Sequence, residues 1–531
     1  MNPTNNIVNL KVLDPMYKGN CLLRLFLVLS VSVISIRVPA EEKPNIVIIL
    51  ADDLGIGDVS SFNEDAAWKT PNIDRLAARG RSFSDAHTSA ALCTPTRYGI
   101  LTGRYSWRST LKKGGYDGYS NPLIDNDRMT IAELFKDNGY NTSLIGKWHL
   151  GLSWQYQGNK KVKFDDKTRR VIDFSKSISN GPEEHGFMYS YGTMASLSSP
   201  PFVYVENSRP TSIPEVISVN YDEKAFWRKG PKGTDFEHVD TLPNIANRSV
   251  RYIKEQTKGD KPFFLYCALT APHAPIIPTT EFIGKSNATA YGDFVLLVDS
   301  VVGQIVDAIT EEDRLENTLI FFTSDNGQSP RADFDDDELP LAGHNGSYIY
   351  RGKKFDIYEG GHRVPFIASW PGKIEKGSHS DETICTVDFM ATAAEMLGVR
   401  LPDEAAEDSY SILSALTQTK LRSPIREATV MHSSGGRFAI RKGDWKLILW
   451  AGSGGWAFPA TEEDMKGLPK FQLYNLKKDP SEKTNLVSKY PKRVSELKTL
   501  LEKYIVDGRS TPGSPQKNDG PERWAELEWM D

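Results

Sequence analysis

Residues 91–104, ALCTPTRYGILTGR, contain one of four cysteines in a chain of 531 residues. The thiol of Cys93 comes two positions before Pro95 and four before Arg97. Because Thr94 can cap a helix and Pro95 suits the first helical position, we expect Cys93 at or just before a helix N-terminus. Free N–H groups there lower a thiol pKa and attract tetrahedral anions such as sulfate or phosphate. Arg97, one turn later, can hold the same anion with its forked guanidinium.

Several apolar runs that read as strands end in polar side chains able to bind ions. They are Asp52 and Asp53 after 45–50, His273 after 263–269, and Asp325 and Asn326 after 318–323. Ligands bind beyond the carboxyl ends of the strands in open α/β sheets, so we expect these side chains to meet. Their oxygens suit Ca²⁺ or Mg²⁺ better than a soft metal. The alternative for each cluster taken singly is a plain turn, since Asp, Asn and Gly are turn formers.

Lys147 and His149 lie in GKWHLG, directly after another apolar run at 140–145. With Arg97, His273 and a cation held by the carboxylates, they would form a strongly anion-attracting pocket. A tetrahedral oxyanion is the expected guest of such a pocket.

The elements that must position these residues alternate between strands and capped helices. Strands are predicted at 45–50, 140–145, 262–269 and 318–323, and helices at 71–79, 131–138 and 294–309. This alternation predicts an α/β fold with a large, mostly parallel central sheet flanked by helices. After about residue 425, short strands and an amphipathic helix at 491–506 predict a smaller C-terminal α+β domain with an antiparallel sheet. The predicted boundaries are 41–425 for the large domain, 426–510 for the small one and 511–531 for a surface-hugging or loose tail.

Residues 1–40 read as a signal peptide. A basic flank precedes the apolar run 25–36, which is too short to span a bilayer, and small residues lead to a cleavage site expected after Ala40. Met16 is an alternative start, and a buried N-terminal helix is an alternative reading of the segment. We therefore expect an exported protein, periplasmic or secreted, without stable membrane insertion.

The overall charge and the remaining cysteines limit the function further. A formal net charge of −5 leaves no basic field for nucleic acid, so no nucleic-acid partner is expected. Three cysteines follow the predicted cleavage site, so at least one is unpaired. Cys267 reads as a small buried hydrophobe, whereas Cys385 is open to either a core position or a disulfide.

At this point the sequence resembles the sulfatase family, within the alkaline-phosphatase-like superfamily. The blocks that carry the resemblance appear in the family's order at 44–58, 70–80, 93–104, 146–151, 271–275, 324–327 and 351–365. The C-terminal stretch FQLYNLKKDPSEKTNL is also similar to the family's small domain. The resemblance implies the alkaline-phosphatase-like sandwich and the hydrolysis of sulfate esters.

The resemblance also implies the chemistry at position 93. In this family the cysteine of C-x-P-x-R is converted to formylglycine by a formylglycine-generating maturation enzyme, and the hydrated aldehyde is the nucleophile. One hydroxyl attacks sulfur, and the other later loses its proton and expels sulfate, which divides the reaction into two steps. Residue 93, Asp52, Asp53, Asp325 and Asn326 would hold the cation, expected to be Ca²⁺ rather than Mg²⁺.

The remaining roles are likewise implied by similarity. Arg97 would stabilise the diol, Lys147 would lie near the sulfate and His149 would be the base. His273 and Lys354 would hold the sulfate and assist the leaving alkoxide, with Lys353 as the alternative to Lys354. The polar residues His185, His344 and Asn345 stay open between substrate contacts and structural positions.

Three functions remain in competition. The first is a sulfatase acting on a sulfated carbohydrate, with 6-O-sulfated galactose or N-acetylgalactosamine suggested by family similarity and residues 104–124 as the candidate specificity loop. The second is a phosphonate monoester or phosphodiester hydrolase that uses the same nucleophile. The third is a catalytically silent glycan-binding relative.

Overall fold

The computed structural model describes residues 42–157, 172–222, 224–332 and 338–530. The predicted signal peptide at 1–40 lies outside these residues. All the elements below belong to the compact unit Lys43–Asp531. Within the described part, no helix has the length and apolar character needed to cross a membrane.

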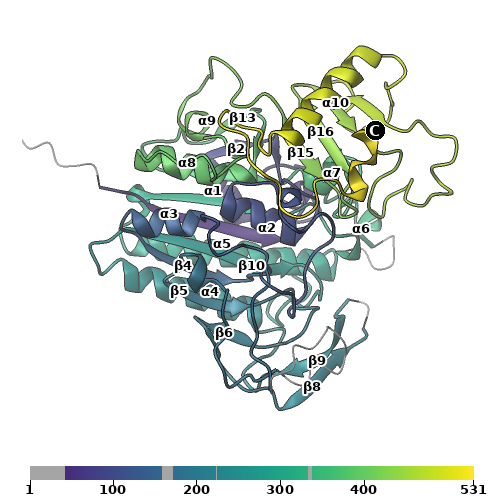
Figure 1. Cartoon of the computed structure of the whole chain (residues 1–531). Coiled ribbons are helices and arrows are strands. Elements are labelled where there is room, and N and C mark those ends of the chain that lie inside the picture. The colour runs from purple at the N-terminus through teal and green to yellow at the C-terminus, as the bar shows by residue number, and fades with distance from the viewer. Residues whose placement is uncertain (1–41, 158–171, 223, 333–337, 531) are drawn as a thin grey trace, which may run out of the picture. The chain divides into compact units, whose positions relative to one another are not determined.

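A ten-stranded sheet forms the centre of this unit (Figure 1). Its order is β13 (Ser378–Ser380), β2 (Arg81–Phe83), β12 (Phe366–Ser369), β11 (Thr318–Ser324), β1 (Asn45–Asp52), β10 (Phe263–Pro272), β4 (Asn141–Gly146), β5 (Tyr189–Thr193), β6 (Tyr204–Glu206) and β7 (Arg209–Pro210). The five strands from β11 to β5 are parallel, while β12, β6 and β7 each run antiparallel to a neighbour. The predicted large and mostly parallel sheet is confirmed.

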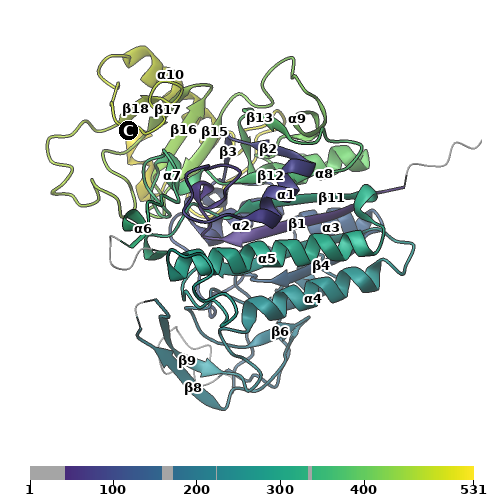
Figure 2. The same cartoon turned by 180° about the vertical axis from the view of Figure 1, so that it is seen from behind.

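Helices cover both faces of the sheet, and β1 shows how. Ile46, Ile48 and Leu50 pack into one core cluster, whereas Val47 and Ile49 pack into another, because successive side chains of a strand point to opposite faces. The first cluster includes residues of α2 (Cys93–Thr102), α3 (Ile131–Asp137) and α8 (Phe389–Leu397). The second includes residues of α1 (Pro71–Arg79), α4 (Thr241–Gln256) and α5 (Ala290–Glu311), of which α4 and α5 lie in front in Figure 2.

Local signals set the ends of several helices where the sequence predicts them. α1 begins at Pro71 after Thr70. At α3, the Thr130 hydroxyl accepts from the Glu133 N–H while the Glu133 carboxylate accepts from the Thr130 N–H, so the capping box is confirmed. α5 begins at Ala290, four residues before the predicted start at 294, because the Thr289 side chain caps it there. Asp293 lies in its first turn.

The C-terminal part contains a four-stranded antiparallel sheet in the order β15 (Thr429–His432), β16 (Phe438–Lys442), β17 (Trp445–Ile448) and β18 (Gln472–Asn475). The helix α10 (Pro491–Val506) buries Leu497 and Leu501 in the same core cluster as this sheet. The predicted antiparallel sheet and amphipathic helix are confirmed.

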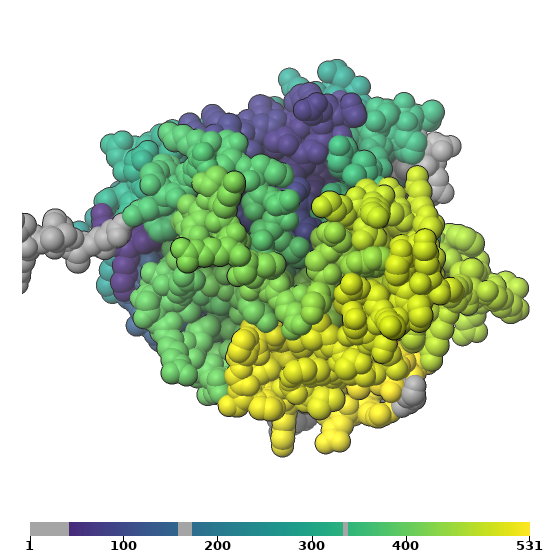
Figure 3. All heavy atoms as spheres, turned by 90° about the horizontal axis from the view of Figure 1, so that it is seen from above, coloured from purple at the N-terminus to yellow at the C-terminus, as the bar shows by residue number. Residues whose placement is uncertain are grey.

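The end of the chain is packed rather than loose. Leu527 and Trp529 are buried in the core cluster of the C-terminal sheet, and Asp519 forms an ion pair with buried Arg104 at 2.7 Å. In Figure 3 this yellow segment lies against green residues that precede it in the chain. Of the two alternatives predicted for this segment, surface-hugging or loose, the packing fits the first, because apolar side chains near the terminus anchor it.

The smaller elements complete the fold. They are β3 (Ala86–His87) paired with β14 (Ile384–Cys385), the hairpin of β8 (Val216–Asn220) and β9 (Trp227–Lys232), and the short helices α6 (Glu338–Leu341), α7 (Glu359–His362) and α9 (Leu413–Thr417). Cys93, Cys267 and Cys385 are all buried free thiols, so both the core position of Cys267 and the core alternative for Cys385 hold.

Candidate functional site

The sheet brings the predicted ion-binding residues to one edge. Asp52 is the last residue of β1, and His273, Asp325 and Lys147 directly follow β10, β11 and β4. These four strands are parallel, so their carboxyl ends meet at the same edge. Within the register, Ala51 pairs with Ser324 and Asp52 with Pro272.

Cys93 lies at the first residue of α2, with Leu92 as the N-cap. The expected position at the helix N-terminus is therefore right, although the helix begins two residues before Pro95 rather than at it. The expected lowering of the thiol pKa is wrong. The Cys93 side chain is buried, and its desolvation raises the pKa even though the charges of Lys147 and Lys354 act in the opposite direction.

Three buried cations each pair with a different buried carboxylate. The ammonium of Lys147 lies 2.6 Å from Asp52 Oδ2. The Arg97 guanidinium donates twice to Asp325 Oδ2, at 2.7 and 2.9 Å. The third pair joins Lys354 Nζ to Asp53 Oδ1 at 2.6 Å. Because each charge has a partner, the site can stay buried without an uncompensated ion.

The carboxylates also affect one another. Burial favours the neutral acid of Asp52, but the positive charges of Lys147 and its neighbours outweigh burial and hold the pKa of Asp52 well below its usual value. Burial, together with the negative charge of Asp52, raises the pKa of Asp325 to about 7. Crowded carboxylates of this kind are relieved by a divalent cation.

The donor atoms fit a hard cation. Ligand atoms of Asp52, Cys93 and Asp325 lie within 4.8 Å of one another, as do those of Asp52, Asp53 and His273. Two buried oxygens in this cluster, Asp52 Oδ1 and Asn326 Oδ1, have no hydrogen-bond partner among the described residues. The Asn326 amide donates to Asp53 Oδ1 at 2.8 Å, which leaves its carbonyl oxygen as a potential ligand. The acidic cluster can therefore bind a metal ion.

His149 is held in one tautomer. Its Nε2 lies 2.8 Å from the carbonyl oxygen of Tyr116 and must donate to it, so Nδ1 carries the lone pair. Nδ1 is buried and has no hydrogen-bond partner in the described chain. Burial and the charge of Lys147 hold the pKa of His149 well below its usual value, so the ring is neutral at pH 7. A free, unprotonated Nδ1 can accept a proton.

Three residues of the site have left-handed backbone conformations that non-glycine residues seldom adopt. They are Asp53 with φ 68°, His149 with φ 60° and Phe355 with φ 83°. Such conformations persist where the surrounding structure imposes them, and they concentrate at active sites and ligand clamps.

A pocket of about 480 Å³ opens onto these residues. Its lining includes Cys93, His149, His273 and Lys354. Gly114, Gly115 and Tyr116 also line it, so part of the candidate specificity loop at 104–124 does reach the pocket.

The residues left open in the sequence fall into different environments. His344 is structural, since its Nε2 lies 2.8 Å from Asp58 and its ring is tilted against Trp68. His185 is buried and stacks on Trp148. Asn345 lines a neighbouring pocket, and Lys353 lines that pocket too. Lys354, and not Lys353, therefore lies beside Cys93.

Other residues in the pocket carry no motif that marks them in the sequence. Arg228, Arg331 and Trp456 all line it. They come from β9, the stretch after Asn326, and a loop after β17, so only the folded chain brings them together. The 11 tryptophans in the composition point to sugar stacking without singling out Trp456.

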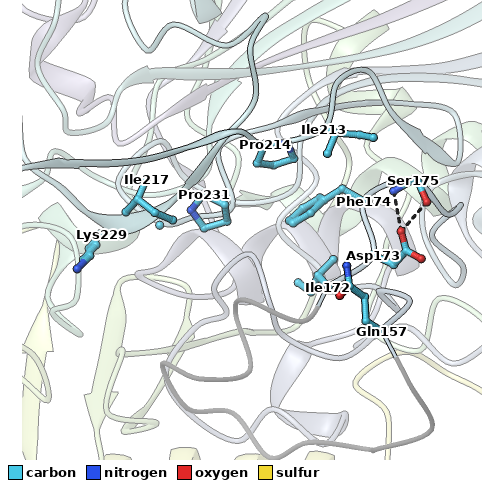
Figure 4. Close-up of a pocket in the computed structure, with 11 residues that line it drawn as sticks. Gln157, Ile172, Asp173, Phe174, Ser175, Ile213, Pro214, Ile217, Lys229 and Pro231 are labelled. Carbon is cyan, nitrogen blue, oxygen red and sulfur yellow. Dashed lines mark hydrogen bonds between the residues drawn. The ribbon is translucent and has the colours of Figure 1, made fainter.

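Two further features lie away from this chemistry. Figure 4 shows a pocket whose lining includes Ile172, Phe174, Ile213 and Pro231, and none of the predicted site residues is among its lining residues. A buried cluster of His87, Glu359 and His362 has the residue types of a metal site. Its ligand atoms are already bonded, however, with Arg441 at 2.9 Å from His87 and Lys446 at 3.0 Å from both others. The positive charges of Arg441 and Lys446 at these distances would repel a metal ion from the cluster.

The sulfatase family model matches residues 44–399, and the model for the C-terminal part of N-sulphoglucosamine sulphohydrolase matches 346–510. An N-acetylgalactosamine-6-O-sulfatase of Bacteroides thetaiotaomicron is 33% identical, over 87% of this chain and 93% of that protein. The N-acetylgalactosamine-6-sulfatase of Canis lupus familiaris is 28% identical, over 93% and 91%. A solved Bacteroides thetaiotaomicron structure, from work on the metabolism of multiple glycosaminoglycans, superposes with a TM-score of 0.75 at 33% identity, over 87% and 99%. The chain belongs to the sulfatase family and hydrolyses sulfate esters.

Proposed function

We propose that this sulfatase removes the 6-O-sulfate of N-acetylgalactosamine, or of the closely similar galactose, in a sulfated glycan. The names of the relatives at 33% and 28% identity support the sugar and the position of the ester. The observation that carries the proposal is the convergence of Cys93, His149, His273 and Lys354 in one pocket above the carboxylate cluster. A sulfate ester has a tetrahedral anionic head that suits this arrangement.

The proposed metal is Ca²⁺, held by Asp52, Asp53, Asp325, Asn326 and an oxygen of residue 93. The ligand types support Ca²⁺ over Mg²⁺, because several carboxylates and an amide carbonyl supply the many protein oxygens that the larger ion takes, whereas Mg²⁺ usually keeps several waters. Bound there, the cation would polarise both the nucleophile and the sulfate oxygens.

The proposed nucleophile is the hydrated formylglycine made from Cys93 by a maturation enzyme. Two features argue against the thiol itself in that role. Its pKa is raised by burial, so little thiolate exists at neutral pH. A sulfated thiol would also lack the second hydroxyl whose proton must be removed to expel sulfate.

His149 is the proposed base. The lone pair on Nδ1 is fixed by the hydrogen bond from Nε2 to Tyr116, so the ring does not need to flip before it takes the proton of a hydroxyl at position 93. Arg97, bonded to Asp325 and to the carbonyl oxygen of Lys147 at 3.0 Å, orients the ion-binding carboxylate.

Lys354 and His273 are proposed to hold the sulfate and assist the departing sugar oxygen. Burial, with the charge of Lys354, lowers the pKa of His273 to about 4, so the ring is neutral before substrate arrives. Its Nδ1 donates to the carbonyl of Ala274 at 2.5 Å, which leaves Nε2 as the atom to be protonated. An anionic ester bound beside the ring favours the imidazolium, which can then act as the general acid.

Export to the periplasm or the medium remains part of the proposal and rests on the sequence of residues 1–40. It would bring the enzyme to polymeric sulfated glycans outside the cell.

The deciding experiment has two parts. The full-length protein is expressed with a formylglycine-generating enzyme, and the peptide containing residue 93 is analysed by mass spectrometry. Sulfate release is then measured from N-acetylgalactosamine 6-sulfate and its 4-sulfated isomer, beside hydrolysis of aryl phosphonate and phosphodiester substrates. Formylglycine with preferential 6-O-desulfation supports the proposal. Faster cleavage of the phosphorus esters would overturn it, and an unmodified thiol without turnover would indicate a silent relative.

A further inference from the structure

The orientation of the His149 ring is set by a backbone carbonyl. Its Nε2 donates to the carbonyl oxygen of Tyr116 at 2.8 Å, and its buried Nδ1 has no hydrogen-bond partner in the described part of the chain. In a neutral imidazole the donating nitrogen carries the proton, so this contact leaves the lone pair on Nδ1. A displaced carbonyl would allow the ring to rotate or to change tautomer. The ring is therefore fixed only as well as the Tyr116 carbonyl is.

Tyr116 lies in a loop, where neither a helix nor a sheet fixes the backbone. Residues 109–130, all within the described ranges, form no helix and no strand. The loop is held instead by contacts with other elements. The Gly114 N–H donates to the carbonyl oxygen of Ser434 at 2.8 Å, and the Tyr116 N–H donates to Thr94 Oγ1 at 3.1 Å. The second contact holds the residue whose carbonyl binds the imidazole.

Thr94 gives this contact a rigid support. It is the second residue of α2, directly after Cys93, and its side chain is fully buried. Branching at Cβ restricts its χ1 angle, so Oγ1 has few directions available. The loop also approaches the helix closely, since a Cβ placed on Gly115 would lie 3.3 Å from Thr94 Oγ1. One turn of helix therefore carries both residue 93 and the hydroxyl that holds Tyr116.

We propose that Thr94 is a positioning residue for the base, because its hydroxyl holds the Tyr116 backbone and thereby the tautomer and direction of His149. This inference rests on the proposed function, in which His149 takes up a proton from residue 93. When sulfate is released, the O–H bond of the remaining hydroxyl breaks and its proton goes to Nδ1. The C=O bond forms, and the C–O bond to sulfate breaks with both electrons leaving on sulfate. Nδ1 accepts that proton only with its lone pair free, so Thr94 acts on the release of sulfate.

The test uses Thr94→Val, which replaces the hydroxyl by a methyl group of similar size, and Thr94→Ser, which keeps the hydroxyl. Both retain the Cys-x-Pro-x-Arg pattern that the maturation enzyme is expected to recognise. Thr102→Val is the matched control, because Thr102 is a fully buried threonine of the same helix. Its hydroxyl donates to the carbonyl of Tyr98 at 2.8 Å, and it is not among the lining residues of the pocket.

Each full-length protein is produced with a formylglycine-generating enzyme, and its conversion at residue 93 is checked by mass spectrometry. The substrates are N-acetylgalactosamine 6-sulfate and an aryl sulfate, whose good leaving group makes the transfer of sulfate to the enzyme fast. Samples quenched during turnover give the fraction of the residue 93 peptide that carries sulfate and the rate at which this sulfate is lost. Initial rates give kcat and KM.

We expect Thr94→Val to slow the loss of sulfate from residue 93 about tenfold, as for the removal of one buried hydrogen bond. Sulfated peptide should accumulate, and kcat should fall where release limits turnover. The ratio kcat/KM includes only the steps up to sulfate transfer and should change less than about twofold. Thr94→Ser and Thr102→Val should match the wild type within about twofold.

A double variant tests whether Thr94 acts through His149. His149→Ala leaves no imidazole to hold, so the addition of Thr94→Val should slow release less than about twofold further. A role of Thr94 in the packing of α2 alone would instead slow release equally in both backgrounds. Thermal unfolding of each variant detects a folding defect. Thr94→Ala is the second variant, and it should show the same slow release because it also lacks the hydroxyl.

Release at the wild-type rate in Thr94→Val and Thr94→Ala would overturn the inference. An equal loss in Thr94→Ser or Thr102→Val, or a further loss in the His149→Ala background, would overturn it as well. Failure of the proposed function looks different. The wild type with formylglycine at residue 93 would then release no sulfate, or His149→Ala would release it at the wild-type rate, and the role of Thr94 would fall with that of the base.

Discussion

Lys354 Nζ lies between both carboxylate oxygens of Asp53, at 2.6 Å from Oδ1 and 2.7 Å from Oδ2. Both side chains are buried, and the negative charge of Asp53 helps to raise the pKa of Lys354 above its usual value despite the opposing effect of burial. The lysine therefore keeps its charge at neutral pH. It connects the buried acidic cluster to the pocket that contains Cys93.

Replacement of Lys354 by Gln is expected to lower kcat about 100-fold or more, because it removes the charge that we propose contacts the reacting sulfate. It also leaves the Asp53 carboxylate buried without its partner, at a cost of about 3 kcal/mol in the free energy of unfolding of the metal-free protein. Added Ca²⁺ should recover part of this stability but not the activity. Lys353→Gln is the matched control, since Lys353 lines the neighbouring pocket. A larger loss of activity in the Lys353 variant would contradict the assignment.

Metal removal gives a separate test of the carboxylate cluster. Chelation should abolish activity and lower the midpoint of thermal unfolding, because an ion that binds the folded state alone stabilises it. Ca²⁺ should restore both at lower concentration than Mg²⁺. Asp325→Asn should weaken the Ca²⁺-dependent shift, whereas Asp307→Asn, at a half-exposed position on α5, should leave it unchanged. Full activity in protein shown by elemental analysis to be metal-free would refute the site.

Trp456 is an exposed aromatic side chain on a rigid support. It is 54% exposed, yet its ring stacks on Phe355 at 4.4 Å and its backbone N–H donates to Asp356 at 2.8 Å. An aromatic surface held in this way at a pocket wall can stack against a sugar ring. Trp456→Ala should raise KM for a sulfated oligosaccharide about fivefold to tenfold with little change in kcat, because the backbone anchor remains.

Phe458→Ala is the control for Trp456, since Phe458 is 71% exposed on the same loop but is not among the lining residues of the pocket. Trp456→Phe should fall between the wild type and the alanine variant. An unchanged KM in Trp456→Ala would show that the ring serves only to cover Phe355.

The sequence predicts those parts of the molecule whose signals are local. The buried strands and the capping box at Thr130 depend on neighbours within a few residues, and the parallel order of the strands then forces Asp52 and Asp325 to one edge. The prediction of a lowered pKa for the Cys93 thiol was wrong. The helix terminus can be recognised in the sequence, but the burial that raises this pKa is a property of the packed chain. The domain boundaries at 425 and 510 stay predictions.

The walls of the pocket could not be predicted for the same reason. Arg228 and Trp456 are more than 200 residues apart in sequence, and each reaches the pocket through a loop or hairpin whose position depends on the rest of the fold. The choice between Lys353 and Lys354 similarly depends on the turn at Phe355, with its left-handed conformation.

His185 leads to a prediction about stability and pH. The ring is buried against Trp148, its two nitrogens have no hydrogen-bond partner among the described residues, and burial lowers the pKa to about 4. The unfolded chain, with an ordinary His pKa near 6.5, binds the proton more readily between about pH 6.5 and 4, so the stabilising contribution present above pH 6.5 is lost as the pH falls. Between pH 7 and 5 this amounts to about 2 kcal/mol at most.

His185→Phe removes the titrating group and keeps a ring that can stack on Trp148. The free energy of unfolding, measured with denaturant at pH 7 and pH 5, should therefore fall less between these pH values in the variant than in the wild type. His379→Phe, at an exposed position on β13, serves as the control and should keep the wild-type pH dependence. If the free energy of unfolding falls as much between pH 7 and pH 5 in the His185 variant as in the wild type, the prediction is contradicted. The acid sensitivity then arises from other groups, and protonation of the buried His185 ring costs little.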